Sequence, residues 1–316
     1  MDYFYTNSTM VSNNTTTLLT LSTSFDSQCR DNPAGFAVWS AIEILTAILG
    51  LPANVAVLWI LLRKQTTLSP SEVFIMNLAV MDALFCLNAP LDISNYYFLD
   101  NPIIYSVTHF VYHFNLIGGP LFLCCICVER YMAVVHPVTY LGLKSLTYRV
   151  VCSAVAWAVT VAFSIYLGMT PLEDTAYVIS GYSCAMFIVM IFCSISILRV
   201  LRRSAPGRDE IHPMMKKAFH MVFTILMIVF VSYFPALAIL PFKSYFNNIT
   251  FKCNIITLCY SFFTPSSCIQ PFLYLSHVGA LSCVQFPCNG GCCMALSPTP
   301  LTQQKTCSIG EQVTSN

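Results

Sequence analysis

Glu129, Arg130 and Tyr131 place an acid, a guanidinium and a phenol side by side at the end of a long apolar stretch, shortly before His136 and Pro137. A guanidinium at the edge of a membrane is costly unless an acid or water neutralises it. We therefore expect Arg130 to be neutralised by Glu129 or by an aqueous partner. The alternative is that Arg130 only extends to lipid headgroups as an anchor.

Asp82 is the second ionisable group in an unusual position, because it lies in the middle of another apolar stretch. An acid at that depth is expensive unless it is protonated, paired or hydrated, so it is a functional candidate. The alternative is a protonated Asp82 that is hydrogen-bonded to Asn54 and serves only the packing.

The elements that position these groups are long and apolar. Of 316 residues, 56% are hydrophobic and 9% are charged, whereas soluble domains carry about 25% charged residues. Each apolar window is long enough for a membrane helix, which needs about 20 residues. We predict an all-α membrane protein with a bundle of seven transmembrane helices, at 36–62, 71–99, 103–135, 146–169, 177–201, 213–242 and 252–277.

The distribution of basic residues predicts the orientation. Of the 15 Lys and Arg residues, 11 follow the first, third and fifth windows or precede the windows that come next. Basic loops stay in the cytoplasm, so the N-terminus is expected to be extracellular. These residues are Arg63, Lys64, Arg130, Lys144, Arg149, Arg199, Arg202, Arg203, Arg208, Lys216 and Lys217.

Glycosylation sequons agree with this orientation, since those at Asn7, Asn13, Asn14 and Asn248 all fall on the predicted external face. No removable signal peptide is expected before residue 36. We predict a glycosylated, disordered extracellular segment at 1–35, a transmembrane receptor domain at 36–277 and a cytoplasmic tail at 278–316. Membrane lipids are expected partners, and nucleic acid is not.

Several motifs give the chain a family resemblance. Asn54 in the first window, Asp82 in the second, Trp157 in the fourth, Phe234-Pro235 in the sixth and Gln270-Pro271-Phe272-Leu273-Tyr274 in the seventh accompany the Glu129 tripeptide. Together they resemble the rhodopsin-like, or class A, G protein-coupled receptors over residues 36–277. The nearest branch is the one that holds nucleotide, lysolipid and protease-activated receptors.

The resemblance implies a switch that couples the receptor to a heterotrimeric G protein. Arg130 is held by Glu129 at rest and turns to the G protein when the sixth helix moves outward. The other implied switch and contact residues are Tyr131, Val138, Lys216, Lys217, Tyr233, Pro235, Pro271 and Tyr274. Core packing explains Tyr233 equally well, and Val138 and Tyr274 have ordinary interfacial roles as alternatives. Met215 replaces an acidic partner for Arg130, which predicts raised basal activity.

The resemblance also implies a site for an allosteric sodium ion at Asp82, Asn115 and Ser267. Gly119 and Gln270 depart from the family pattern there, which weakens the predicted site. No other cofactor is expected.

The cysteines predict one external bridge and one lipid attachment. Cys29 and Cys253 are expected to form a disulfide on the oxidising external side, as in chemokine-like and nucleotide-receptor-like branches. Tyr105 replaces the cysteine that most members bridge to the second outer loop, which is itself short, at 170–176. Cys288, Cys292 and Cys293 are palmitoylation candidates, with unmodified cysteines as the alternative.

A ligand pocket is implied between the outer halves of the helices, where the family binds its ligands. Polar candidates there are Glu43, Asn88, Asp92, Tyr96, His109, Tyr112, His113 and Tyr260. Two acids and two histidines permit a cationic peptide group, a polar lipid or proton sensing. The alternative is that they are hydrogen-bonded groups of a packed core.

The leading hypothesis is a multi-pass plasma-membrane receptor that binds an extracellular ligand, such as a lipid, a peptide or another small molecule, and activates heterotrimeric G proteins. A transporter or channel is one alternative, and a receptor-like scavenger that does not signal is another. The acids and histidines lack the spacing of metal ligands or of a nucleophile and its base, so no catalytic site is expected.

Overall fold

The computed structural model of the chain describes residue 29 and residues 34–65, 68–143, 145–169, 172–203, 213–239, 242 and 245–278. All regular structure in these ranges is helical. The elements are α2 (Ala34–Leu62), α3 (Pro70–Ser94), η1 (Asn95–Leu99), α4 (Pro102–Val135), α5 (Pro137–Leu143), α6 (Leu146–Met169), α7 (Leu172–Arg203), α8 (Pro213–Ile239), α9 (Asn248–Thr250), η3 (Phe251–Ile256), α10 (Thr257–Phe263) and α11 (Ser266–Val278).

Local signals explain where two of the long helices begin. Ser69 caps α3 by accepting a hydrogen bond from the amide of Glu72, whose carboxylate accepts in return from the amide of Ser69. Pro70 then occupies the first turn, where its missing N–H costs nothing. At the start of α4, Asn101 likewise caps the helix by accepting from the amides of Ile103 and Ile104, and Pro102 follows it in the first turn. Because Pro137 disfavours helix at the residue before it, α4 ends at Val135.

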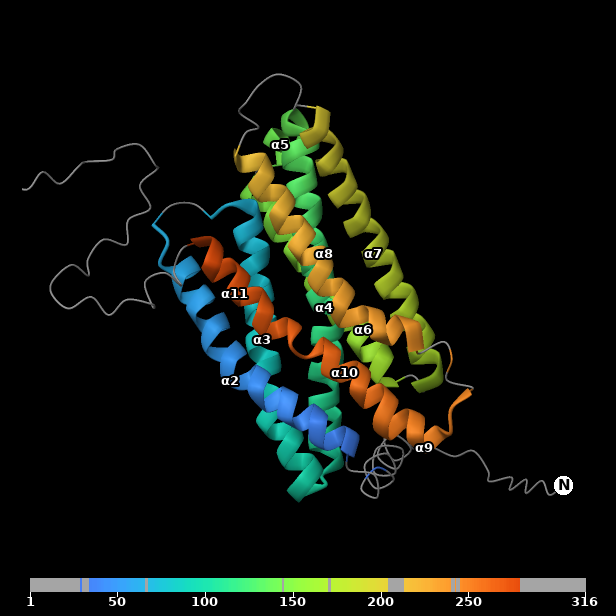
Figure 1. The fold of residues 1–316 in the computed structure, drawn as a ribbon. Helices are drawn as coiled ribbons and strands as arrows, with labels where there is room; N and C mark the ends of the chain where they lie inside the picture. Colours follow the sequence, from blue (N-terminus) through green and yellow to red (C-terminus); the bar gives the residue numbers. More distant parts are fainter. Residues whose placement is uncertain are drawn as a thin grey trace, which may run out of the picture.

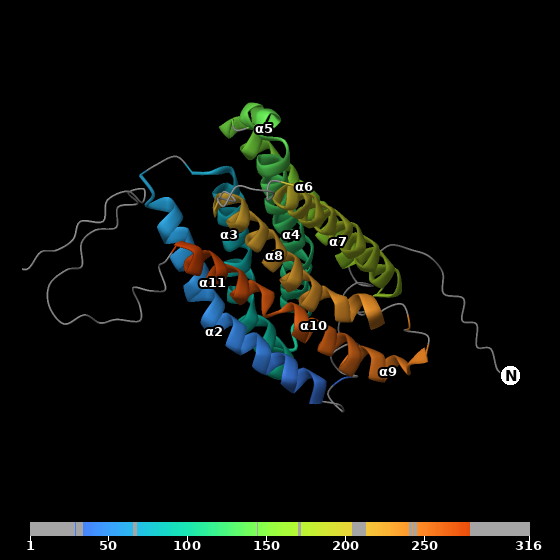
Figure 2. The same cartoon turned by 45° about the horizontal axis from the view of Figure 1, so that its top comes forward.

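The helices form one bundle with α4 at its centre. α4 packs against α3, α6, α7 and α8, while α2 packs against α3, α10 and α11 (Figures 1 and 2). Phe85, Ile117 and Phe122 are completely buried in the core that surrounds α4. Gly118 leaves room for the end of the Met81 side chain of α3, with which a Cβ there would collide.

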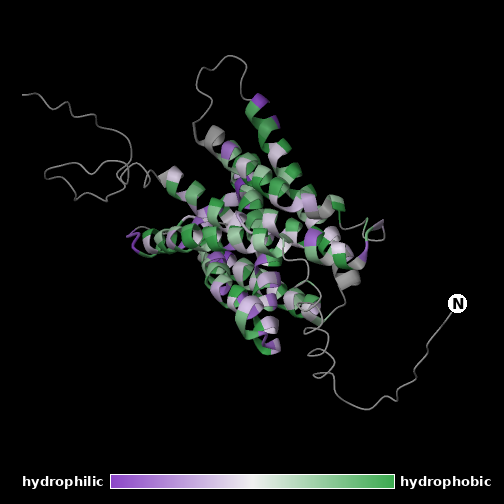
Figure 3. Ribbon diagram, turned by 60° about the horizontal axis from the view of Figure 1, so that its bottom comes forward, coloured by the Kyte–Doolittle hydropathy of each residue, from purple (hydrophilic) through white to green (hydrophobic). Residues whose placement is uncertain are grey.

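Many large apolar side chains are exposed on the outside of the bundle, among them Leu45, Ile48 and Trp59, and Figure 3 shows apolar residues along the long helices. Among the described residues, six helices are long and apolar enough to cross a membrane: those at 34–62, 70–99, 102–135, 147–169, 177–202 and 218–235. The seventh apolar stretch is divided into α9, η3, α10 and α11, with a turn at Thr264 and Pro265. The bundle therefore has the seven crossing segments that were predicted, and the last of them is divided by this turn.

Two further boundaries differ from the predictions. α7 begins at Leu172, so most of the stretch predicted as the loop 170–176 is helical. The second predicted helix ends as α-helix at Ser94 and continues as the π-helix η1 to Leu99. At α7 the helix begins before the apolar pattern does, because a helix end outside an apolar core needs no apolar side chains, whereas the change to π-helix at Asn95 lies within the predicted window.

The two ends of the bundle differ in chemistry. The basic end contains the C-termini of α2, α4 and α7 and the N-termini of α3, α6 and α8, with α5 nearby (Figure 1). The disulfide end contains the start of α2 and the elements α9 and η3, where Cys29 and Cys253 form the predicted disulfide with a Cα–Cα distance of 5.3 Å. Gly35 packs there against the backbone of Cys253.

Candidate functional site

At the basic end, Glu129 interacts with side chains from α3, α4 and α5. It is buried in α4 and accepts hydrogen bonds from the hydroxyl of Ser71 in α3 and from the hydroxyl of Tyr140 in α5, the latter at 2.5 Å. Its Oε2 also lies 3.3 Å from Nε of Arg130, which forms an ion pair. The Nε of Arg130 has no hydrogen-bond partner among the described residues. Glu129 thus attracts Arg130 by charge, while its hydrogen bonds come from the two hydroxyls.

Tyr140 remains a donor in this network. Burial and the hydrogen bond to Glu129 raise the pKa of the Tyr140 phenol, so the phenol stays protonated at physiological pH. Tyr131 faces away from Glu129, because its hydroxyl lies 3.1 Å from Nε2 of His136 and its ring contacts Phe192 of α7. The phenol of Tyr131 therefore holds the end of α4 and does not take part in the ion pair.

Val138 in α5 is 82% exposed at the basic end, so it is accessible to a partner or to lipid. Lys216 and Lys217 lie in the first turn of α8, but the placements of their side chains, and of the Met215 side chain, lie outside the described residues. Two other basic side chains at this end have hydrogen-bond or ion-pair partners. Lys64 pairs with Glu72 at 2.7 Å, and Arg149 donates to the carbonyl of Leu68 at 2.7 Å.

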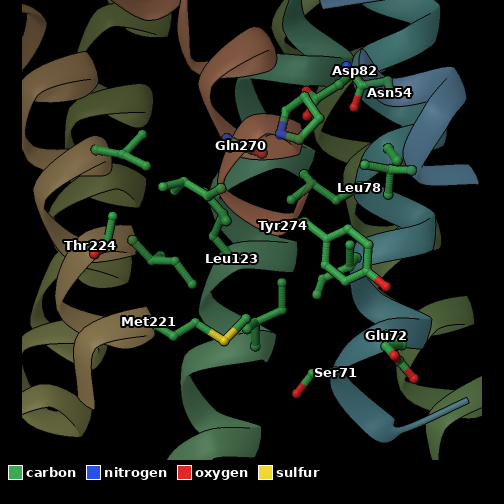
Figure 4. Close-up of a pocket in the computed structure, with 18 of the residues that line it drawn as sticks. Asn54, Ser71, Glu72, Leu78, Asp82, Leu123, Met221, Thr224, Gln270 and Tyr274 are labelled. Carbon is green, nitrogen blue, oxygen red and sulfur yellow. The ribbon is translucent and has the colours of Figure 1, made fainter. Parts of the chain in front are cut away.

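A cavity of about 220 Å³ joins Arg130 to Asp82 through the interior of the bundle. Figure 4 shows Asp82, Asn54 and Gln270 together at one end of it and Ser71 and Glu72 at the other. Apolar side chains such as Leu78, Leu123 and Met221 line the middle, and the ring of Tyr274 lies between the two polar ends (Figure 4). The two groups expected to do chemistry in the membrane therefore share one internal space.

Asp82 is held by a partner other than the predicted Asn54. Asn115 donates a hydrogen bond of 2.9 Å to Oδ1 of Asp82, and the hydroxyl of Ser267 donates to Oδ1 of Asn115 at 3.3 Å. Asn54 bonds instead to the carbonyls of Gly50 and Ser267, each at 2.9 Å. The alternative that joined Asp82 directly to Asn54 was therefore wrong, because Asp82 is bonded to Asn115 and no hydrogen bond joins it to Asn54 among the described residues.

Three oxygens near Asp82 fit the chemistry of a sodium ion. Oδ2 of Asp82, Oδ1 of Asn54 and Oε1 of Gln270 are buried and have no hydrogen-bond partner among the described residues. All three residues line the cavity. Hard cations prefer carboxylate and amide oxygens, and these three oxygens are free of hydrogen bonds, whereas the hydroxyl of Ser267 donates to Asn115. Gly119 leaves space nearby, since a Cβ there would be 3.7 Å from the hydroxyl of Tyr233.

The predicted switch residues occupy different surroundings. Tyr233 is buried, and its hydroxyl donates to the carbonyl of Leu116 at 3.5 Å. Its ring packs against Phe263 of α10. Pro235 interrupts the backbone hydrogen bonding of α8, and Pro271 does the same in α11 beside the cavity. The prolines and Tyr274 adjoin the internal space or its helices, so they can change its shape.

The pocket candidates at the disulfide end separate into two groups. Asn88 donates to the carbonyl of Thr108 at 3.2 Å, and Tyr96 stacks on Phe36 with ring centroids 3.8 Å apart. His109 stacks on Tyr105 and meets His113 edge-on at 4.3 Å between ring centroids. These residues have packing partners, as expected for groups that join helices.

The second group consists of buried polar atoms with no hydrogen-bond partner among the described residues. It includes both carboxylate oxygens of Glu43, the hydroxyl of Tyr112 and Nδ1 of His113. The ring of Tyr112 contacts Tyr260 at 4.6 Å between centroids. Asp92 lies near Glu43 and interacts with it electrostatically. These residues come from α2, α3, α4 and α10.

Other predicted sites lie outside the described residues. They are the sequons at Asn7, Asn13 and Asn14, the side chain of Asn248 and the cysteines Cys288, Cys292 and Cys293. Sequence reasoning also missed Ser71 and Tyr140, which bond to Glu129, and Trp39 and Ser40, which accompany Glu43. Only the pairing of helices brings Ser71 to Glu129, 58 positions away, so no local pattern could have identified it.

Known proteins resemble the chain along most of its length. Residues 53–184 match the family described as 7 transmembrane receptor (rhodopsin family). Human proteinase-activated receptor 3 is 28% identical over 272 residues, which cover 74% of this chain and 70% of that protein. A purinoceptor of Xenopus laevis is 28% identical over 72% of this chain and 49% of its own length. Human chemokine XC receptor 1 is 26% identical over 75% of this chain and 76% of its own length.

Proposed function

Because the chain belongs to the rhodopsin family of seven-transmembrane receptors, we propose that the Glu129–Arg130 pair is the switch through which it activates its G protein. The receptor is a multi-pass protein of the plasma membrane that answers an extracellular ligand by G protein signalling. Its family consists of receptors and not of enzymes. A transporter is accordingly not favoured.

We place the basic end in the cytoplasm and the N-terminus outside. All Lys and Arg residues with described side chains lie at the basic end: Arg63, Lys64, Arg130, Arg149, Arg199 and Arg202. Positive residues are retained on the cytoplasmic side during insertion. This orientation also gives the disulfide the oxidising environment in which such bonds persist.

In the resting state, Glu129 attracts Arg130 at the base of α4. Activation moves the basic end of α8 away from α4 and widens the cavity, so that Arg130 turns from Glu129 to the G protein. Pro235 and Pro271 permit the helix bending that this requires, and Tyr274 moves into the widened space. Val138 in α5 supplies an apolar contact for the same partner.

One observation carries this proposal: the ion pair at 3.3 Å lacks an aligned hydrogen bond at Nε of Arg130, while Glu129 keeps two hydroxyl donors of its own. Releasing Arg130 therefore does not leave a bare buried carboxylate, which would be far more costly than losing a charge contact. The resting state is held weakly, and we expect measurable basal signalling.

Nucleotide exchange on a purified G protein, with the receptor in lipid nanodiscs, tests this function. Arg130→Ala should abolish basal exchange, whereas Arg63→Ala removes the same charge at the same end and should retain it. Among the described residues, the guanidinium of Arg63 stacks on Trp59, 3.8 Å from the ring centroid. Exchange that survives in Arg130→Ala would contradict the proposal. An inactive wild-type receptor across a panel of G proteins would favour the scavenger.

A sodium ion held by Asp82 and Gln270, with Asn54 beside them, is a further part of the proposed resting state. A bound cation there neutralises Asp82 and joins α2, α3 and α11 across the cavity. The three oxygens without hydrogen-bond partners support this assignment. For the extracellular ligand, the disulfide end is the proposed binding region, and a lipid or a peptide is compatible with its aromatic and acidic side chains.

A further inference from the structure

Glu43 in α2 is the most unusual ionisable group at the disulfide end. Its side chain is completely buried, with the residue only 1% exposed. Neither carboxylate oxygen has a hydrogen-bond partner among the described residues. An isolated buried carboxylate is among the most costly arrangements in a membrane protein, and it marks a functional site unless a partner reaches it.

The described side chains around Glu43 do not supply a positive charge; those of Arg30, Lys243 and Lys252 lie outside the described part of the chain. Glu43 interacts electrostatically with Asp92 and Cys86 of α3 and with Tyr112 of α4. A neighbouring acid increases the cost of the buried charge and does not offset it. Every Lys or Arg whose side chain the structure describes lies at the opposite, basic end.

Further polar atoms without partners lie on the same part of α2. Trp39 and Ser40 precede Glu43 by one turn, and both are 5% exposed. The Nε1 of Trp39 and the hydroxyl of Ser40 are buried without hydrogen-bond partners among the described residues, as is the hydroxyl of Tyr112 in α4, which interacts electrostatically with Glu43. Native proteins rarely leave several neighbouring groups unsatisfied, so these atoms indicate an occupant that completes them.

Aromatic rings border this group on the side of α4 and α10. Tyr112 contacts Tyr260 with centroids 4.6 Å apart and Phe85 with centroids 5.7 Å apart. Ring faces attract cations within about 6 Å, more strongly where water is excluded. Acids beside aromatic rings are therefore suited to an organic cation and unsuited to a carboxylate or a phosphate.

We propose that Glu43 is the counter-ion for a cationic group of the extracellular ligand, an amine, amidine or guanidine, with Asp92 as a second acid and Tyr112 and Ser40 as hydrogen-bonding partners. This assignment rests on the proposed receptor function and narrows its ligand class. Asp82 does not share the role, because it is bonded to Asn115 and faces the internal cavity of the basic half.

The test uses the purified full-length receptor in nanodiscs and three matched probes: benzamidine, its neutral isostere benzamide and its anionic isostere benzoate. Benzamidine presents two N–H donors in the geometry that a carboxylate accepts. At about ten times its dissociation constant, benzamidine should raise the unfolding temperature by about 2–4 °C. Benzamide and benzoate should leave it unchanged.

Variants test whether the benzamidine shift in unfolding temperature arises at Glu43. Glu43→Gln, which keeps the shape and removes the charge, should lose the benzamidine shift, and Asp92→Asn should reduce it. Glu72→Gln removes an acid at the basic end and should keep the full shift. Should Glu43→Gln fold poorly, wild-type receptor still decides the matter through the three probes alone.

Three results would overturn the inference: an equal shift from benzamide, a full benzamidine shift in Glu43→Gln, or no benzamidine shift in the wild type. A fourth is a stabilisation on lowering the pH that benzamidine cannot increase, since the occupant would then be a proton. Unfolding temperatures do not depend on a G protein, so this failure is distinguishable from a failure of Arg130→Ala to abolish nucleotide exchange.

Discussion

Glu129 at the basic end and Glu43 at the disulfide end are both buried acids, yet their surroundings are opposite. Glu129 accepts from Ser71 and Tyr140 and pairs with Arg130, while Glu43 has no hydrogen-bond partner among the described residues. Among the described residues, no disulfide joins the helices around Glu129, whereas at the Glu43 end Cys29, which precedes α2, is bonded to Cys253 of η3. We expect the helices of the basic end to separate on activation. The disulfide end should stay fixed and bind the ligand.

Removing the covalent link is expected to have the largest effect on this contrast. Cys29→Ser should lower the free energy of unfolding by about 2–4 kcal/mol, because the bond restricts a long stretch of the unfolded chain. The unfolding temperature of the purified receptor measures the loss. Cys184→Ser, which removes an exposed cysteine that is not in a disulfide, is the matched control. Equal stability of Cys29→Ser and wild type would remove the claim of a covalently fixed end.

Removing the unpaired acid should have the opposite sign. Glu43→Leu is expected to raise the free energy of unfolding without ligand by about 1–3 kcal/mol, the cost of an unsatisfied buried polar group. Glu129→Leu provides the comparison. It leaves Ser71, Tyr140 and Arg130 without the carboxylate that they share and should lower the free energy of unfolding. Thermal unfolding of both variants decides the point. A loss of stability in Glu43→Leu would mean that Glu43 already has a partner.

The hydrogen bonding of Glu129 can be changed by a smaller step, the removal of one of its two hydroxyl donors. Ser71→Ala leaves Glu129 with one hydroxyl donor, so the carboxylate depends more on Arg130 and holds it more firmly. One hydrogen bond contributes about 0.5–1.5 kcal/mol, which corresponds to a decrease in basal exchange of roughly two- to tenfold. Exchange assays with Ser69→Ala, a change in the cap of the same helix, provide the control. Increased basal exchange in Ser71→Ala would show that Ser71 restrains the switch.

The smallest expected effect concerns the internal cavity between Arg130 and Asp82. Replacing potassium with sodium in the buffer should raise the unfolding temperature of the wild type by about 1–2 °C, since a single weakly bound ion contributes little. Asp82→Asn should abolish the difference between the two salts. Ser267→Ala should keep part of it, because the free oxygens belong to Asp82, Asn54 and Gln270. A salt difference that is unchanged in Asp82→Asn would remove sodium from the account.

The sequence predicted most of the fold because membrane helices need long apolar runs, and these are visible without any alignment. Capping signals at Ser69 and Asn101 even mark where α3 and α4 begin. The interruption at Thr264 and Pro265 was missed, since the apolar pattern continues through it. The extension of α7 back to Leu172 was missed for the converse reason, as Glu173 and Asp174 are polar but helical.

The site was predictable only as far as motifs reach. Glu129, Arg130, Asp82 and the Cys29–Cys253 pair could be singled out by residue type and position. Their partners could not, because Ser71 and Asn115 meet Glu129 and Asp82 through helix packing, across 58 and 33 positions. Whether a buried acid such as Glu43 has hydrogen-bond donors around it likewise depends on residues that are distant in the sequence. No local sequence pattern distinguishes Glu43 from Glu129 in this respect.

The most direct test of the central claim measures whether the basic end opens. Nitroxide labels introduced as non-cysteine residues at Tyr148 in α6 and His220 in α8, both exposed, report their separation by double electron–electron resonance. The account predicts that a nucleotide-free G protein lengthens this distance in the wild type, and that Arg130→Ala prevents the change. An unchanged distance in the wild type, in the presence of nucleotide exchange, would contradict it.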